Sequence, residues 1–524
     1  MEDDYLARAT IKTSSRFFNR TSFVVILILF LASIWMQKNL GSNKDNACLI
    51  QTAKALLQGQ HYFKDFFESN TPMAVYIYMP ALLIAQVGFI SLAIALEIYA
   101  LVMTALVLWL IQRLLTHRAF SAIARATVLC AIAAGLLIVP SADFGQREHL
   151  LIIFVLPYLI ASAFVLNQTI QKYPVRLLIF IGVLAGIGFA IKPHFLIAFL
   201  AVEIYVGIYR KKLFCFCRPE VLAILFVQVI YLYSLFLVTP EYLADIVPIN
   251  MSLYYAMVIK PGNTIITPAF LICLLVLCAH CFVTRVTADI TAIRKMLAVS
   301  LVAFLLIYIL QQAYWYYHSL PAFILAFILL ALLMYEQVIV ARATTHKMRL
   351  LPWIAFSLLG WLVTLYVCVT FVELQADWLH QKAIEPAYQR MIQFTKHHVP
   401  PHRSIFFFAP SLYPAYPMNI DTSIDTHYFN GYLITPMAEQ AFAKRHVGPA
   451  FLNYYVQQTI RLLQKEQPFL IFIRATPVEA YGETKPAPYV SIFNHHKAFR
   501  QFWSHYRLIG QQDGFDVYVD NHTN

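Results

Sequence analysis

Long apolar runs dominate the first 372 residues of the 524-residue chain. Runs of 17 or more mostly apolar residues recur between Phe23 and Val372, and each is long enough to cross a bilayer core about 30 Å thick. The pattern predicts an α-helical polytopic membrane protein. We expect about eleven transmembrane helices, near residues 22–38, 89–112, 123–140, 150–167, 177–191, 194–209, 220–238, 264–283, 297–314, 319–336 and 351–372.

One apolar segment is long enough for two crossings. Residues 72–112 are almost continuously apolar, but two crossings would move Arg113 and Arg118 to the other side of the membrane and invert every later loop. We therefore expect one crossing at residues 89–112. Residues 71–87 are then an interfacial helix on the outer side, with Pro72 in its first turn.

The charge of the loops gives the orientation of the helices. One alternating set of loops carries 19 basic and six acidic residues, whereas the other set carries seven of each sign. Basic loops face the cytoplasm, so the N-terminus is expected there. The net charge of +12 thus reflects membrane topology, and no nucleic-acid partner is needed to explain it.

The composition changes after residue 372. Residues 373–524 hold 13 basic and 12 acidic residues, with strand-like runs at 404–408, 469–473 and 515–519 and helix-like stretches around 382–396 and 448–466. This alternation predicts a small α/β domain. An odd number of crossings places it outside. We expect a transmembrane module, 1–372, with outer loops 39–88 and 141–149, followed by a soluble outer domain, 373–524.

The first outer loop contains three acidic candidates. Asp45 stands just before a helical pattern, where a carboxylate can cap free amides, but the same position suits a general base at the membrane surface. Asp65 and Glu68 flank two phenylalanines. They form either a solvated turn or part of a substrate site.

The second outer loop concentrates ionisable groups at the start of a crossing. Asp143, Arg147, Glu148 and His149 fall within ten residues, at a depth where charge is expensive to hold near lipid. Arg147 and Glu148 could simply pair with each other. Four such groups exceed what an anchor requires, and this favours a functional site.

We expect two further clusters of polar residues on the same outer side of the membrane. Lys192 and His194 lie between two crossings, where a lysine can also serve only as a membrane anchor. Residues 311–321 form an aromatic belt containing Tyr316, and His318 is not required by such a belt. Cations and carboxylates at one interface suit a lipid-linked phosphate and a hydroxyl acceptor, because cations stabilise a phosphate leaving group while a carboxylate takes the proton.

The loop layout and the residues around Asp45 resemble the GT-C superfamily of integral membrane glycosyltransferases. These include protein O-mannosyltransferases and the aminoarabinose transferases acting on lipid A. The resemblance lies in the run from Asp45 to Gly59, continuing through Tyr62, Asp65, Phe66 and Pro72. Asn46 replaces a common glutamate, which leaves Asp45 as the only match to the family's catalytic acid position and gives no support for a metal.

The resemblance implies an inverting transfer of a hexose or pentose from a polyprenyl-phosphate carrier to a hydroxyl of a lipid, glycan or protein. Asp45 would be the base, Arg147 and Lys192 would neutralise the departing phosphate, and His194 or His318 would donate hydrogen bonds to it. Asp143 or Glu148 would orient the acceptor. The expected catalytic residues are Asp45, Asp143 and Glu148. The expected substrate contacts are Asp65, Glu68, Arg147, His149, Lys192, His194, Tyr316 and His318.

We expect no cofactor and a bacterial inner membrane, with the outer domain in the periplasm. An alternative from another class is a transporter or flippase of a lipid-linked or anionic solute. Such proteins place their ionisable residues near the midplane and often contain repeats. A dependence on Glu97 and Glu203, which lie within predicted crossings, would favour that alternative.

Overall fold

The chain folds into two compact units in the computed structural model. The first comprises residues 1–41, 97–233 and 260–374, and the second comprises residues 42–96, 234–259 and 375–524. The first outer loop therefore groups with the C-terminal segment. The predicted division at residue 372 stays a prediction. Residues described by the structure are 20–38, 43–116, 120–166, 173–211, 216–251, 267–282, 288–311, 315–343, 360, 386–410, 412–422, 424–429, 448–478 and 483–521.

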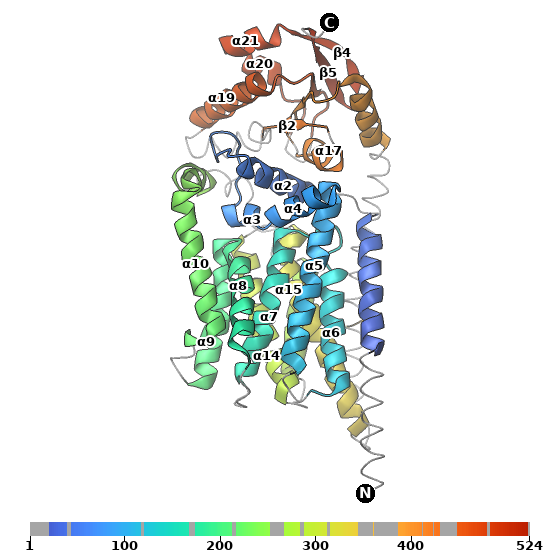
Figure 1. The fold of residues 1–524 in the computed structure, drawn as a ribbon, viewed down its shortest axis with the longest axis vertical. Coiled ribbons are helices and arrows are strands. Elements are labelled where there is room, and N and C mark those ends of the chain that lie inside the picture. The colour runs from blue at the N-terminus through green and yellow to red at the C-terminus, as the bar shows by residue number, and fades with distance from the viewer. Residues whose placement is uncertain are drawn as a thin grey trace. The chain divides into compact units, whose positions relative to one another are not determined.

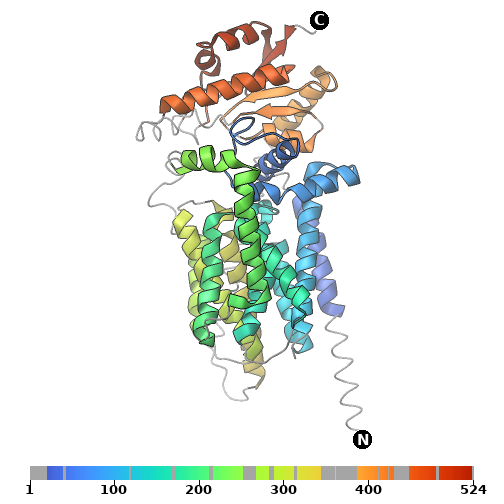
Figure 2. The same cartoon turned by 60° about the vertical axis from the view of Figure 1, so that its left-hand side comes forward.

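The first unit is a bundle of apolar helices. Figure 1 shows α7, α8, α14 and α15 side by side, and Figure 2 shows the bundle helices nearly parallel from a second direction. Helix α7 is central, since all of its residues except Val165 are buried. The helices are Arg20–Lys38, α5 (Leu92–Thr116), α6 (Ala122–Leu137), α7 (Arg147–Leu166), α8 (Val175–Ala190), α9 (Leu196–Arg210), α10 (Pro219–Leu237), α13 (Pro268–Phe282), α14 (Ala288–Gln311) and α15 (Tyr316–Ala343).

Seven of the described helices are long and apolar enough to cross a membrane. Three shorter apolar helices, α6, α8 and α13, fall at three further predicted crossings. Large apolar side chains on α10 are exposed, among them Phe226 at 62% and Val229 at 65%, as expected of a surface that faces lipid. The polytopic helical architecture is confirmed. The predicted crossing at 351–372 lies outside the described residues apart from Gly360.

The segment 71–87, predicted as one helix, is helical but is interrupted at residues 77–78. Two short helices stand there, α3 (Pro72–Tyr76) and α4 (Met79–Gly88). Thr71 caps α3 by accepting a hydrogen bond from the N–H of Ala74 at 3.4 Å. Pro80 has no N–H to continue the first helix and instead lies in the first turn of the second.

The second unit contains the five-stranded sheet of the C-terminal domain. The strand order is β2-β1-β3-β5-β4, with β1 parallel to β2 and β3, and β5 antiparallel to β3 and β4. The α/β domain is confirmed, although β2 and β4 were not predicted. The elements are β1 (Ile405–Phe408), α17 (Ala415–Asp421), β2 (Thr426–Tyr428), α19 (Gly448–Glu466), β3 (Leu470–Arg474), α20 (Tyr489–Phe493), α21 (Lys497–Trp503), β4 (Tyr506–Gln512) and β5 (Phe515–Asp520).

The first outer loop packs on this domain within the second unit. Helix α2 (Lys44–Leu57) contacts α17, and the Gln51 amide donates to Oδ1 of Asn419 at 2.6 Å. The Tyr454 hydroxyl donates to the carbonyl of Phe63 at 2.8 Å, and the two rings stack with centroids 4.0 Å apart. The helix that carries Asp45 is therefore held by the C-terminal domain.

A glycine allows close packing of α8 on α10. A Cβ at Gly182 would lie 2.3 Å from the carbonyl oxygen of Glu220 and 2.7 Å from Cβ of Ala223. We expect Gly182→Ala to destabilise the protein by about 1–3 kcal/mol, because backbone atoms must move to admit the methyl group. The measurement is the thermal unfolding temperature in detergent. Gly207→Ala is the control, since nothing lies within 4 Å of its Cβ position; an equal effect of the two substitutions would contradict the packing argument.

Candidate active site

A sharply bent loop places the second outer cluster. After α6 the backbone takes positive φ angles at Ser141 (+49°), the first residue of a short 3₁₀ turn, η1 (Ser141–Asp143), and at Gly145 (+75°). Helix α7 then begins at Arg147, which puts Glu148 in its first turn. A carboxylate is favoured there by the exposed amides and dipole of the helix start.

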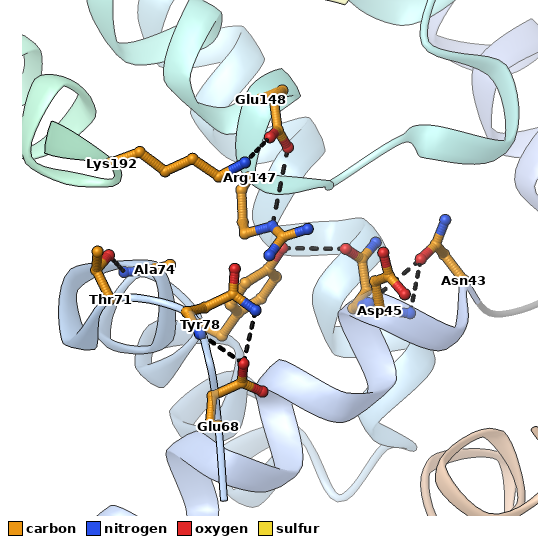
Figure 3. A network of polar contacts seen from close by, with 11 residues as sticks. Asn43, Asp45, Glu68, Thr71, Ala74, Tyr78, Arg147, Glu148 and Lys192 are labelled. Atoms are coloured by element: carbon orange, nitrogen blue, oxygen red, sulfur yellow. Dashed lines mark hydrogen bonds and ion pairs between the residues drawn. The ribbon is translucent and has the colours of Figure 1, made fainter. Parts of the chain in front are cut away.

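Glu148 is the centre of a buried charge cluster in the first unit. Its side chain is fully buried, and Oε1 accepts a hydrogen bond from Nζ of Lys192 at 2.5 Å. Nε of Arg147, which is also buried, lies 3.8 Å from Oε2. Figure 3 shows both cations pointing toward this carboxylate. One carboxylate thus contacts two cations, so the cluster is suited to receive a further anion.

Two histidines complete this cluster. His318 is within electrostatic range of Lys192, Glu148, Arg147 and His194. Nδ1 of His318 and Nε2 of His194 are buried and have no hydrogen-bond partner among the described residues. The Arg147 guanidinium lies 5.6 Å from the ring centre of Tyr317, which packs against His318. The histidine nitrogens can therefore bond an oxygen atom that enters the cluster.

His149 and Tyr316 have backbone partners instead. His149 Nδ1 accepts the N–H of Gly145 at 3.0 Å, so Nε2 carries the proton and donates to the carbonyl of Leu136 at 2.8 Å. The hydroxyl of Tyr316 donates to the carbonyl of Val139 at 2.9 Å. With both ring nitrogens engaged, His149 does not suit the expected substrate contact, and it holds the loop to the end of α6. The hydrogen bond of Tyr316 likewise joins the first residue of α15 to the backbone just after α6.

The structure corrects the local role of Asp45. The N-cap of α2 is Asn43, whose side-chain oxygen accepts the N–H groups of Asp45 at 2.9 Å and Asn46 at 3.3 Å (Figure 3). Asp45 lies inside the first turn and is half-buried. Asn46 accepts a hydrogen bond from the Tyr78 hydroxyl at 3.0 Å. The alternative in which Asp45 serves only as a cap is therefore wrong.

The other three acidic candidates lie in different environments. Glu68 is buried, which excludes the solvated turn for it; it accepts the backbone and side-chain N–H groups of Asn70 at 2.8 and 2.6 Å. Asp65 is exposed and accepts the N–H of His61 at 2.8 Å. Asp143 ends η1, and its carbonyl accepts the N–H of Gln146 at 3.0 Å. Roles for these three in substrate binding stay predictions.

Sequence reasoning missed an ion pair in the second unit. Nζ of Lys64 donates to Oε1 of Glu241 at 2.6 Å. Burial by itself would raise the pKa of Glu241, but the hydrogen bond from Lys64 lowers that pKa below its ordinary value. The same bond raises the pKa of Lys64. The two residues are far apart in the chain, so no local pattern could have paired them.

Charges inside the bundle are paired as well. Glu203 is fully buried, as the sequence predicts for an acid within a crossing. It contacts Arg218 and accepts a hydrogen bond from the Tyr158 hydroxyl at 2.6 Å. Arg294 pairs with buried Glu336 in the same way. Glu203 thus has a structural explanation, which removes one reason to consider a transporter.

Solved structures of similar architecture exist for ArnT from Cupriavidus metallidurans. The structure bound to undecaprenyl phosphate is 10% identical, with a TM-score of 0.53 over 95% of this chain and 97% of that chain. The apo structure is 12% identical, with a TM-score of 0.54 over 97% and 98%. The fold of this chain is similar to that of ArnT. The similarity supports the predicted polytopic helical architecture followed by a C-terminal domain. No family model and no curated protein matches the sequence.

The Glu148 cluster leads to a double-substitution prediction. We expect Glu148→Gln to destabilise the protein by about 3–5 kcal/mol, because it leaves the buried Arg147 and the mostly buried Lys192 without their carboxylate. Adding Lys192→Met should recover part of the loss. The thermal unfolding temperatures of both variants in detergent test this, and a double variant no more stable than Glu148→Gln would show that the ion pair is not coupled.

Proposed function

We propose that this protein transfers a sugar from a polyprenyl-phosphate carrier to a hydroxyl group at the outer face of the membrane. The observation that carries the proposal is the cluster in which Arg147 and Lys192 share the buried Glu148, beside two histidines that each have a ring nitrogen without a hydrogen-bond partner among the described residues. A phosphate would receive charge-assisted hydrogen bonds from the cations and further bonds from His194 and His318. Support also comes from the ArnT fold, since one ArnT structure holds undecaprenyl phosphate.

The leaving phosphate needs this arrangement. As the bond between the sugar and the phosphate breaks, negative charge grows on the phosphate oxygen, and fixed cations in a site of low polarity stabilise that charge most strongly. Glu148 keeps Lys192 and Arg147 in place before substrate arrives. Its buried, bridged position suits a positioning residue better than the acceptor contact expected from the sequence.

Asp45 is the proposed general base. Asn43 caps α2, so the Asp45 carboxylate is not required for that task, and it can take the proton of the acceptor hydroxyl as the oxygen attacks the anomeric carbon. Attack opposite to the departing phosphate inverts the configuration of that carbon. The acceptor, the sugar and a location in a bacterial inner membrane with the C-terminal domain in the periplasm are parts of this proposal. No metal is assigned to the transfer.

The test is a transfer assay with purified protein in lipid and a panel of polyprenyl-phosphate sugars. We expect Asp45→Asn to lower the rate by about 10²–10⁴-fold, because the base is lost. Lys192→Met should lower it by about 10²–10³-fold, because the phosphate loses a cation. The matched controls are Asp516→Asn, in β5, and Lys295→Met, in the first half of α14. Both variants should keep the wild-type rate.

Stability measurements separate chemistry from folding. Asp45→Asn should keep the wild-type unfolding temperature, whereas Asn43→Ala should lower the stability by about 0.5–2 kcal/mol through loss of the cap. Wild-type transfer by Asp45→Asn would remove Asp45 as the base. Translocation of a lipid-linked substrate without any transfer would support the transporter instead.

A further inference from the structure

Three metal-ligating side chains meet in the C-terminal domain, outside the proposed transfer site. His427 lies on β2, the edge strand of the sheet, Asp425 directly precedes that strand, and Glu466 ends α19. Nε2 of His427 is 3.2 Å from Oδ2 of Asp425 and 3.5 Å from Oε2 of Glu466. The three ligand atoms lie within 4.8 Å of one another.

A hydrogen bond alone accounts poorly for this geometry. An imidazole nitrogen carries at most one hydrogen, so Nε2 of His427 can donate one good bond, yet two carboxylate oxygens approach it. The two carboxylates would also repel each other without a cation between them. In a tetrahedral zinc site with bonds of about 2.0–2.2 Å, neighbouring ligand atoms are separated by about 3.3–3.6 Å, and the two measured distances are close to this spacing.

The surroundings keep these ligands available. Glu466 uses its other oxygen, Oε1, to contact Lys465 at 3.2 Å, so Oε2 is not taken by that lysine. Glu466 is also the last residue of α19, where the helix dipole favours a positive charge.

We propose that Asp425, His427 and Glu466 bind a zinc ion. An imidazole nitrogen with two carboxylates favours Zn²⁺ over Mg²⁺ and Ca²⁺, which prefer oxygen ligands throughout. Asp425 and His427 also line a pocket of about 140 Å³ in the second unit, together with Asn419 and Tyr428. The remaining coordination position is taken by water or by a donor atom of a molecule in this pocket.

The direct test is zinc binding by the full-length protein after removal of metal with a chelator. Isothermal titration with ZnCl₂ gives affinity, and elemental analysis after dialysis gives stoichiometry. We expect the wild type to retain one more equivalent of zinc than His427→Ala, and Glu466→Gln to bind that equivalent at least tenfold more weakly. MgCl₂ should not compete at equal concentration.

Control variants come from the same domain. His495→Ala removes an exposed histidine and Asp516→Asn an aspartate of β5, and both should retain the wild-type zinc content. If His427→Ala does not fold, the zinc affinity of Glu466→Gln tests the proposal. This variant should fold, because glutamine keeps the size of the side chain and can still accept a hydrogen bond. Equal zinc content and affinity in wild type and Glu466→Gln would overturn the proposal. Sugar transfer does not enter this readout, so the proposal stands or fails independently of the proposed function.

Discussion

The arrangement of the first unit around its site depends on one buried carboxylate. Glu148 carries a charge that would be costly to hold inside an apolar bundle, and it is tolerated because Lys192 and Arg147 contact it. Lys192 comes from the turn between α8 and α9, so this contact joins that turn to the start of α7. The same contact holds two cations at the ends of apolar helices, which is the proposed site of the phosphate.

The proposed base belongs to the second unit. Asp45 lies on α2, which Asn43 caps and which the C-terminal domain holds through Gln51 and Asn419. The loop containing Phe63 is fixed to the same domain by Tyr454. Residues 42–96 and the C-terminal domain therefore belong to one compact unit, and the C-terminal domain helps to hold the helix that carries the proposed base.

The sequence predicted features that depend on local pattern. Apolar length predicted the crossing helices, and loop charge singled out Arg147, Glu148 and Lys192, which the structure brings together. Features that depend on distant contacts were not predictable. Both ring nitrogens of His149 are hydrogen-bonded to backbone atoms, whereas Nδ1 of His318 has no partner in the part of the chain that the structure describes. Nothing in the neighbouring sequence of either histidine predicts this difference. The short edge strand β2 forms only because β1 pairs with it.

The most direct measurement is the affinity of the purified protein for undecaprenyl phosphate compared with undecaprenol, the same lipid without the phosphate. A thermal-shift titration in detergent measures both, since a ligand that binds only the folded protein raises its unfolding temperature. If the Glu148 cluster is a phosphate site, undecaprenyl phosphate will stabilise the protein and undecaprenol will do so only at much higher concentration. Equal stabilisation by the two lipids would contradict a phosphate site in the bundle.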